Sequence, residues 1–221
     1  MQTIFITGTD TDAGKTYVAV ALLQGLKALG YRTVAQKPVA AGVNESGLNT
    51  DALSLRQHAT EQLSYELVNP YCLTDAVAPH LAAAKAGLCI EPAVLTQELQ
   101  KLQVMDADIA LVEGAGGWLL PLDDKTTMAD WVTEQQLPVL LVVGMKLGCL
   151  NHALLTVREI ERSGLKLLGW VANCIDPDMA YQQENISHLQ QTLTAPCLGV
   201  LPYLSEPQIN TSLATSLVKQ M

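Results

Sequence analysis

The sequence predicts a single-domain α/β protein with three layers, in which a mainly parallel sheet is covered by helices on both faces. Two observations lead to this fold class. Short runs rich in Val, Ile and Leu recur without polar alternation, as expected for strands buried on both faces. Helix-length segments separate these runs, and such alternation is typical of a parallel sheet. Strands are expected at residues 3–7, 33–37, 109–112, 139–144, 167–172 and 197–201.

The intervening segments predict the helices. They are expected at residues 15–29, 91–103, 128–136, 151–162 and 179–193. A further helix begins near residues 49–51, where Asn49, Thr50 or Asp51 can serve as its cap. No repeat or Pro/Gly/Ser-rich linker divides the chain, so residues 1–221 are predicted to form one domain. Ligands of such sheets bind at the carboxyl ends of the strands.

Composition excludes several classes of function. The formal net charge of −9 disfavours binding to nucleic acid or to anionic lipid. The longest apolar stretch, residues 137–143, is far shorter than the roughly 20 residues of a membrane span. The N-terminus lacks a basic region and a cleavage site, so we expect a cytoplasmic protein. Five cysteines without a C-x-x-C spacing indicate neither a disulfide framework nor a zinc site.

A phosphate-binding loop follows the first expected strand. Its sequence is Gly8-Thr9-Asp10-Thr11-Asp12-Ala13-Gly14-Lys15-Thr16, and an apolar helix-length segment comes next. Strand, loop and helix are the context that a P-loop requires. Loop N–H groups can surround phosphate oxygens, Lys15 can reach the terminal phosphates, and the Thr16 hydroxyl can bind Mg²⁺. The chain therefore has a predicted P-loop NTPase-like fold, although five residues rather than the usual four separate Gly8 from Gly14.

Charged residues follow the second and third strands. Lys37 precedes Pro38 at the end of a buried strand, where it can direct a fixed cation toward the phosphate loop or extend to solvent. Glu113 closes the third strand and is typical of a Walker B carboxylate that binds magnesium. The glycines after it allow the backbone to approach a ligand closely. For Asp51 taken alone, helix capping is the simpler interpretation.

Together these motifs resemble the dethiobiotin synthetase family, in order and at comparable spacing from residue 1 to about residue 204. The motifs are Gly8-Thr9-Asp10-Thr11-x-x-Gly14-Lys15-Thr16, Lys37-Pro38-Val39, Asp51-Ala52, Asn69-Pro70, Pro79-His80, Glu113-Gly114-Ala115-Gly116-Gly117, Lys146-Leu147-Gly148-Cys149-x-Asn151-His152-Ala153 and Gly169-Trp170-Val171-Ala172-Asn173. The resemblance implies that 7,8-diaminononanoate, CO₂ and MgATP yield dethiobiotin, ADP and phosphate. ATP would phosphorylate a carbamate, and the second amine would then attack the carbamic-phosphoric anhydride.

The resemblance also implies roles for individual residues. Catalysis would involve Lys37, Lys15 and Thr11, and Mg²⁺ would be held by Thr16, Asp51 and Glu113. ATP would be bound by Asp12, Ala13, Gly14, Lys15, Thr16, Tyr17, Asp51, Glu113, Gly114, Ala115, Gly116, Asn173, Cys174, Pro202, Tyr203 and Leu204. Substrate would be bound by Lys37, Ala41, Pro79, Gly148, Cys149, Leu150 and Asn151. The family forms homodimers whose active site lies at the interface, with residues 148–151 of one subunit facing the substrate of the other.

Two departures and three alternatives remain at this point. Ala41 stands where the family usually has a serine, and Asn185 stands where relatives often have a tyrosine. A partitioning ATPase would share the fold, but it would carry a lysine at the position of Asp10. Cys174 replaces the lysine of a guanine-binding N-K-x-D motif, which disfavours GTP. An amide-forming carboxylate ligase would use the same activation chemistry, but no glutamine-hydrolysing module is present.

Overall fold

A computed structural model describes residues 1–203, 214–215 and 218–219. Its main sheet has six strands in the order β2-β5-β1-β6-β7-β8, and all neighbouring strands are parallel. The six predicted strands are therefore confirmed. Their bounds are β1 (Gln2–Gly8), β2 (Thr33–Gln36), β5 (Ile109–Glu113), β6 (Val139–Met145), β7 (Leu167–Cys174) and β8 (Cys197–Leu201).

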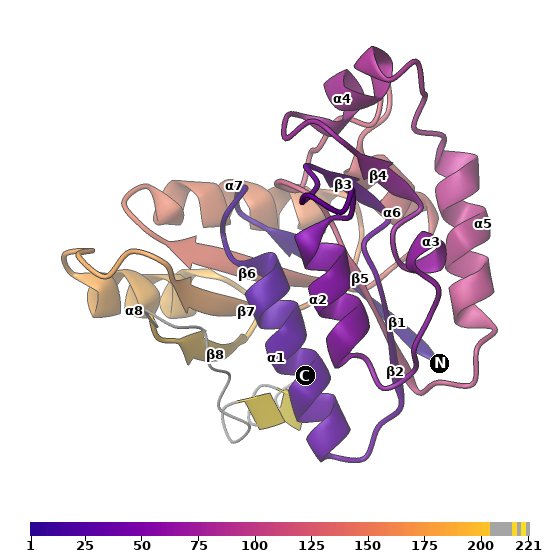
Figure 1. Cartoon of the computed structure of the whole chain (residues 1–221). Helices are drawn as coiled ribbons and strands as arrows, with labels where there is room; N and C mark the ends of the chain where they lie inside the picture. The colour runs from indigo at the N-terminus through magenta and orange to yellow at the C-terminus, as the bar shows by residue number, and fades with distance from the viewer. Residues whose placement is uncertain (204–213, 216–217, 220–221) are drawn as a thin grey trace.

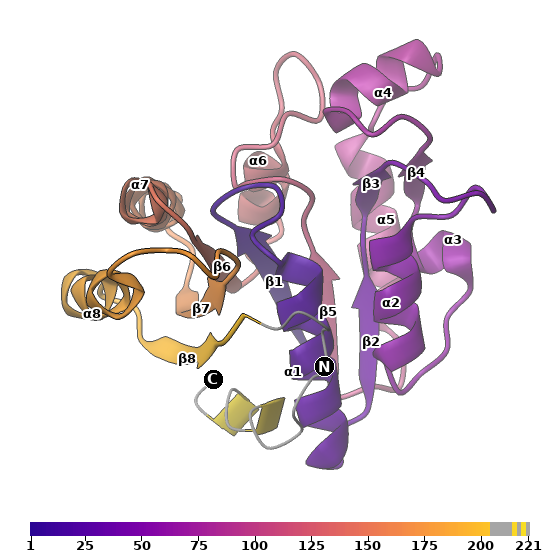
Figure 2. The same cartoon turned by 60° about the vertical axis from the view of Figure 1, so that its left-hand side comes forward.

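Helices cover both faces of this sheet, as Figures 1 and 2 show. All six predicted helices are present, including the one expected to begin near residues 49–51, and the ends of the other five differ from prediction by up to three residues. The helices are α1 (Lys15–Ala28), α2 (Thr50–His58), α3 (Tyr65–Val68), α4 (Pro79–Lys85), α5 (Pro92–Gln103), α6 (Met128–Glu134), α7 (Cys149–Arg162) and α8 (Gln182–Thr192).

The central strand β1 packs against helices on both faces of the sheet, because its successive side chains point to opposite faces. Ile4 and Ile6 pack with α1 and α2 in one buried cluster. Phe5, between them, packs on the other face with α5 and α6. A third buried cluster joins β6 and β7 to α7 and α8. The apolar runs are thus covered on both sides, as their lack of alternation predicted.

A second, two-stranded sheet of β3 (Val39–Ala41) and β4 (Tyr71–Leu73) was not predicted. The expected strand at residues 33–37 ends at Gln36, because the chain leaves the main sheet there and the Lys37 N–H donates to the carbonyl of Val68. Helices α3 and α4 were also missed, since four and seven residues are too few to display a helical period.

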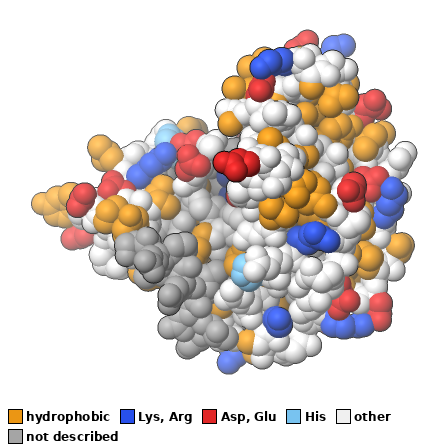
Figure 3. All heavy atoms as spheres, in the orientation of Figure 1, with side chains coloured by type: hydrophobic (Ala, Val, Ile, Leu, Met, Phe, Trp, Pro, Cys, Tyr) orange, Lys and Arg blue, Asp and Glu red, His pale blue; other side chains and the backbone are white. Residues whose placement is uncertain are grey.

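The surface carries no concentrated basic patch on the face drawn in Figure 3, where Lys and Arg side chains are scattered among Asp and Glu. Within the described part of the chain, no helix is both long and apolar enough to cross a membrane. The carboxyl ends of β1, β2 and β5 meet at one edge of the main sheet, next to the small sheet. Of the predicted site residues, Lys15, Lys37 and Glu113 lie at or just after the ends of these strands.

Candidate active site

A cavity of about 730 Å³ opens where the phosphate loop, β3 and the segment after β5 meet. One side of the cavity is polar and charged, and the other is formed by small apolar side chains. Its lining includes Thr11, Asp12, Gly14, Lys15, Thr16, Lys37, Ala40, Ala41, Asn49, Asp51, Ala76, Val77, Ala78, Pro79, Glu113, Ala115, Gly116 and Leu120.

The phosphate loop, residues 8–16, connects β1 to the start of α1. Gly14 is the N-cap of α1 and has a φ of 85°, a left-handed conformation that favours glycine. A Cβ at this position would overlap the side-chain amide of Asn173. That amide donates a hydrogen bond of 2.9 Å to the carbonyl of Ala13. Asn173, near the end of β7, therefore holds the loop through the Ala13 carbonyl and leaves the N-terminus of α1 directed into the cavity.

Lys15 folds back over this loop. Its ammonium donates to the carbonyl of Asp10 at 3.1 Å and to the carbonyl of Gly116 at 2.6 Å. Burial, and after it the charge of Lys37, lowers the pKa of Lys15 to about 8. Anionic phosphate oxygens would offer this ammonium stronger partners than two neutral carbonyls.

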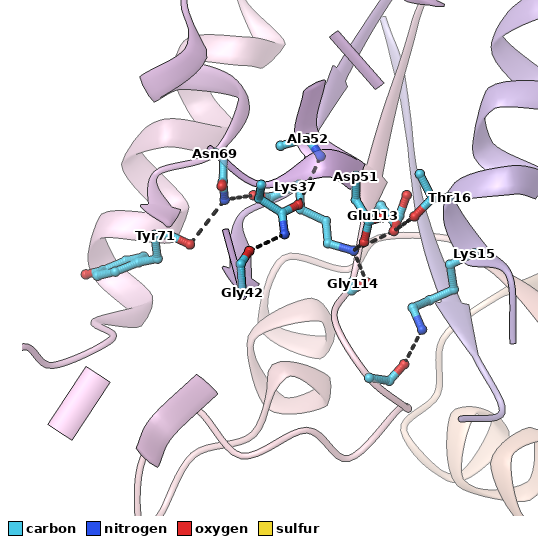
Figure 4. Close-up of polar contacts among 12 residues, drawn as sticks. Lys15, Thr16, Lys37, Gly42, Asp51, Ala52, Asn69, Tyr71, Glu113 and Gly114 are labelled. Carbon is cyan, nitrogen blue, oxygen red and sulfur yellow. Dashed lines mark hydrogen bonds and ion pairs between the residues drawn. The ribbon is translucent and has the colours of Figure 1, made fainter. Parts of the chain in front are cut away.

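Lys37 forms a buried cluster with Asp51 and Glu113, which we call the Lys37 cluster. The Lys37 ammonium lies 3.0 Å from Asp51 Oδ2 and 2.5 Å from Glu113 Oε1 (Figure 4). Lys37 is 4% exposed and Glu113 is fully buried. Burial alone lowers the pKa of Lys37, but the two carboxylates outweigh it and raise that pKa above its usual value. The sequence did not indicate this double ion pair.

The same carboxylates and Thr16 form an oxygen-rich set suited to Mg²⁺. The Thr16 hydroxyl donates to Glu113 Oε1 at 2.7 Å, while Glu113 Oε2 is buried without a hydrogen-bond partner among the described residues. Asn49, not Asp51, caps α2 by accepting from the N–H of Ala52, so capping does not occupy Asp51. The described residues contain no cluster of three or more His, Cys, Asp or Glu side chains arranged for a metal. Magnesium bound with phosphate needs only one or two carboxylates, and the set therefore fits.

The remaining predicted residues fall into three places. Thr11, Asp12, Ala41, Pro79, Ala115 and Gly116 line the cavity. The cavity lining does not include Ala13, Tyr17, Gly114, Asn173, Cys174, Pro202 or Tyr203, and of these Pro202 and Tyr203 are exposed. Leu204 lies outside the described residues.

Residues 148–151 lie apart from this cavity. Gly148 is the N-cap of α7, and none of Gly148, Cys149, Leu150 and Asn151 is among the lining residues. Sequence reasoning missed the wall formed by residues 76–78 and Leu120, because a short apolar loop has no periodic signal. It also missed Asn49, whose side chain was considered only as a possible cap.

Comparison with known proteins identifies the family. A protein-family model described as an AAA domain matches residues 2–209. ATP-dependent dethiobiotin synthetase BioD 1 of Escherichia coli O157:H7 is 49% identical over 211 residues, covering 94% of this chain and 93% of the relative. The corresponding synthetase of Cellvibrio japonicus (strain Ueda107) is 50% identical over 207 residues, covering 92% and 90%.

The chain belongs to the ATP-dependent dethiobiotin synthetase family. It is therefore an enzyme of the ATP-dependent ligase class. Its fold is shared more widely, since the MinC:MinD cell division protein complex of Aquifex aeolicus matches with a TM-score of 0.63. That match covers 100% of this chain and 95% of the other, at 14% identity. Similarity at that level extends to the fold alone, whereas the dethiobiotin synthetases match in sequence along nearly the whole chain.

Proposed function

We propose that this enzyme converts 7,8-diaminononanoate, CO₂ and MgATP into dethiobiotin, ADP and phosphate in biotin synthesis. One observation carries the proposal. Lys15, Thr16, Asp51, Glu113, Lys37, Ala41 and Pro79, to which the family resemblance assigned phosphate, metal or substrate, come from separate segments of the chain, yet they line one cavity. We further propose that the reaction takes place in the cytoplasm.

The chemistry needs ATP because a carbamate oxygen is a poor leaving group. One amine of the substrate first adds to CO₂ and forms a carbamate. The γ-phosphoryl group then moves from ATP to a carbamate oxygen, which releases ADP. Attack by the second amine on the carbamate carbon closes the cyclic urea and releases phosphate. No step requires an activated protein nucleophile, so positioning and charge neutralisation are the tasks of the protein.

The phosphate loop would position ATP. Its N–H groups and the N-terminus of α1 would bind the phosphates of ATP, and Lys15 would exchange its carbonyl partners for phosphate oxygens. Thr16, Asp51 and Glu113 would hold Mg²⁺, which neutralises charge on the terminal phosphates. Asn173, Cys174, Pro202 and Tyr203 lie beyond the loop at the ends of β7 and β8, where the base of ATP would be bound.

Lys37 would neutralise charge on the reacting groups, and the apolar wall would position the diamine. The Lys37 ammonium would stabilise the carbamate and the transferring phosphoryl group, since its charge is already fixed at the edge of the cavity. Residues 76–78, Pro79 and Leu120 offer an apolar surface suited to the alkyl chain of the diamine. Ala41 lines the same part of the cavity without offering a hydroxyl.

We also propose a homodimer with the active site at its interface. Residues 148–151 lie outside the cavity of their own subunit, and the adjacent Leu147 is 93% exposed. The N-terminus of α7 is a suitable binding site for a carboxylate. In a dimer, the substrate carboxylate of one subunit would bind there on the other. Sedimentation of the purified enzyme would test this, and a monomer with full activity would contradict it.

The decisive experiment measures ATP consumption and product mass with the diamine and bicarbonate supplied separately and together. We expect ADP and dethiobiotin to form in equal amounts only when both are present, because the phosphoryl acceptor is the carbamate. Rapid hydrolysis without them, stimulated by DNA, lipid or a protein, would instead indicate a partitioning ATPase. A product other than a cyclic urea would indicate another ligase.

A further inference from the structure

The backbone of Lys37 lies between two sheets and belongs to neither. Strand β2 ends at Gln36, which pairs with Val112 in the main sheet. Strand β3 begins at Val39, which pairs with Tyr71 in the small sheet. Ladder hydrogen bonds therefore do not fix the peptide groups of Lys37, although its ammonium must be held accurately for the proposed chemistry.

The end of α3 supplies the missing partners. The Lys37 N–H donates to the carbonyl of Val68 at 2.7 Å. The side-chain amide of Asn69 donates to the Lys37 carbonyl at 2.7 Å, and to the carbonyl of Tyr71 at 3.1 Å (Figure 4). Asn69 is only 2% exposed, so water does not compete strongly for these bonds. Both backbone groups of Lys37 are thus held by two consecutive residues.

A phenol joins Asn69 to the start of α2. Tyr65 donates its hydroxyl proton to Asn69 Oδ1 at 3.0 Å and accepts from the N–H of Asn49 at 2.7 Å. Burial raises the pKa of Tyr65 to about 12, so the hydroxyl remains a proton donor at neutral pH. Asn49 caps α2, and Asp51 in the first turn of that helix binds the Lys37 ammonium.

The contacts therefore close a ring that runs from the Lys37 carbonyl through Asn69, Tyr65 and α2 to the Lys37 ammonium. We propose that Asn69 and Tyr65 are positioning residues for the reaction, which act by fixing Lys37 relative to Asp51 and the cavity. This inference rests on the proposed function and extends it, because neither side chain lines the cavity. The ring fixes both the backbone and the ammonium group of Lys37, and so it sets the direction of the side chain.

Tyr65→Phe tests the ring with little loss of packing, and Tyr71→Phe is its matched control. Tyr71 lies six residues away, is also half-buried, and accepts from a backbone N–H at the start of a helix, that of Glu91 at 3.0 Å. Among the described residues, its hydroxyl forms no hydrogen bond with Lys37, Asn69 or Asn49. Each variant loses one phenol hydroxyl, but only Tyr65→Phe breaks the ring.

We expect Tyr65→Phe to lower kcat for dethiobiotin formation by about threefold to tenfold, because the hydrogen bonds of its hydroxyl to Asn69 and Asn49 are lost. Asn69→Ala should lower kcat further, by about tenfold or more, because the two bonds to backbone carbonyls are lost together with the bond from Tyr65. The Kd for ATP should stay within about twofold in both variants, since the phosphate loop is untouched. Tyr71→Phe should retain the kcat of the wild type.

Repeating Tyr65→Phe in a Lys37→Ala background separates positioning from general stability. If Tyr65 acts through Lys37, its removal has no further effect on kcat once the ammonium is gone. An equal loss in both backgrounds, or equal kcat values for Tyr65→Phe and Tyr71→Phe, would overturn the inference. Failure of the proposed function would give a different result, because the wild-type enzyme itself would then form no dethiobiotin. In that case this inference would also be wrong.

Discussion

The phosphate loop and the Lys37 cluster each place a buried lysine in the same cavity, but they hold it in opposite ways. Lys15 donates to two neutral carbonyls, and its pKa is lowered to about 8, chiefly by burial. Lys37 contacts two carboxylates, which raise its pKa although burial lowers it. The difference shows that burial alone does not set the pKa of a lysine, because charged groups within hydrogen-bonding distance can outweigh the effect of burial.

This contrast indicates a division of labour. A lysine that rests on neutral carbonyls gains strongly from an arriving anion, which suits nucleotide binding. A lysine whose charge and position are fixed beforehand gains less on binding, but it can act on charge that develops during the reaction. Variants of the two regions should therefore differ in which kinetic constant they change.

The largest expected effect is that of Lys37→Ala on the chemical step. We expect kcat to fall by roughly 10² or more, by analogy with removal of one strong electrostatic donor. The Kd for ATP should change little, because Lys15 and the loop N–H groups bind the phosphates. Single-turnover kinetics and equilibrium ATP binding measure the two quantities separately.

Lys37→Arg provides the control for this prediction. It keeps the positive charge, but a planar guanidinium does not fit the place of a compact ammonium between two carboxylates, so kcat should recover only in part. Loss of ATP binding in Lys37→Ala, with normal turnover at saturation, would reverse the division of labour. Lys37 would then be a nucleotide anchor.

A smaller effect is expected from Gly14→Ala in the phosphate loop, and it should fall on ATP binding. Alanine is strained at a φ of 85°, at a cost of roughly 1–2 kcal/mol, and its Cβ would overlap the Asn173 amide. We expect ATP affinity to fall by about tenfold or more. In an Asn173→Ala background the penalty should be smaller, since the overlap is relieved and only the strain remains. An equal penalty in both backgrounds would mean that Asn173 does not press on the loop.

These two regions also differ in how far the sequence predicts them. The phosphate loop is local, so Gly14, Lys15 and Thr16 could be placed from strand, loop and helix signals alone. The Lys37 cluster combines three distant segments, and the sequence indicated only that Lys37, Asp51 and Glu113 follow strands or begin a helix. Their ion pairs depend on where β2 leaves the main sheet. The α3 segment that holds Lys37 is too short to give a periodic signal, and Asn69 was noted only within a motif.

Ala41→Ser should have a moderate effect, on the diamine rather than on ATP. Ala41 lines the cavity at the end of β3, at the position where the resemblance leads us to expect a serine in relatives. A hydroxyl there would add a hydrogen bond to a charged group, worth at most about 1.5–3 kcal/mol, of which water can already supply part. The diamine KM should therefore fall while kcat and the Kd for ATP stay nearly constant. An unchanged diamine KM would show that this contact is unimportant in this enzyme.

The smallest expected effect concerns the partly exposed ion pair between Lys146 and Asp10 of the phosphate loop. Lys146, just before α7, lies 2.9 Å from Asp10, and the two side chains are 37% and 45% exposed. The hydrogen bond from Lys146 lowers the pKa of Asp10 below its ordinary value of 3.8. Because the folded-state pKa is lowered, the stabilisation is present above pH 3.8 and is lost as the pH falls through the folded pKa.

Lys146→Met should therefore reduce the free energy of unfolding at pH 7 by less than about 1 kcal/mol, since solvent screens a pair that is this exposed. The difference from wild type should shrink steadily as the pH is lowered below 3.8, because protonation of Asp10 removes its charge from both proteins. Urea unfolding at a series of pH values measures it. Lys166→Met removes an exposed lysine that forms no ion pair with the described residues, and it should show no such pH dependence. If the difference in unfolding free energy between Lys146→Met and wild type stays constant through this pH range, it arises from packing of the lysine stem. The Lys146–Asp10 ion pair would then not stabilise the phosphate loop electrostatically, in contrast to the ion pairs that hold Lys37.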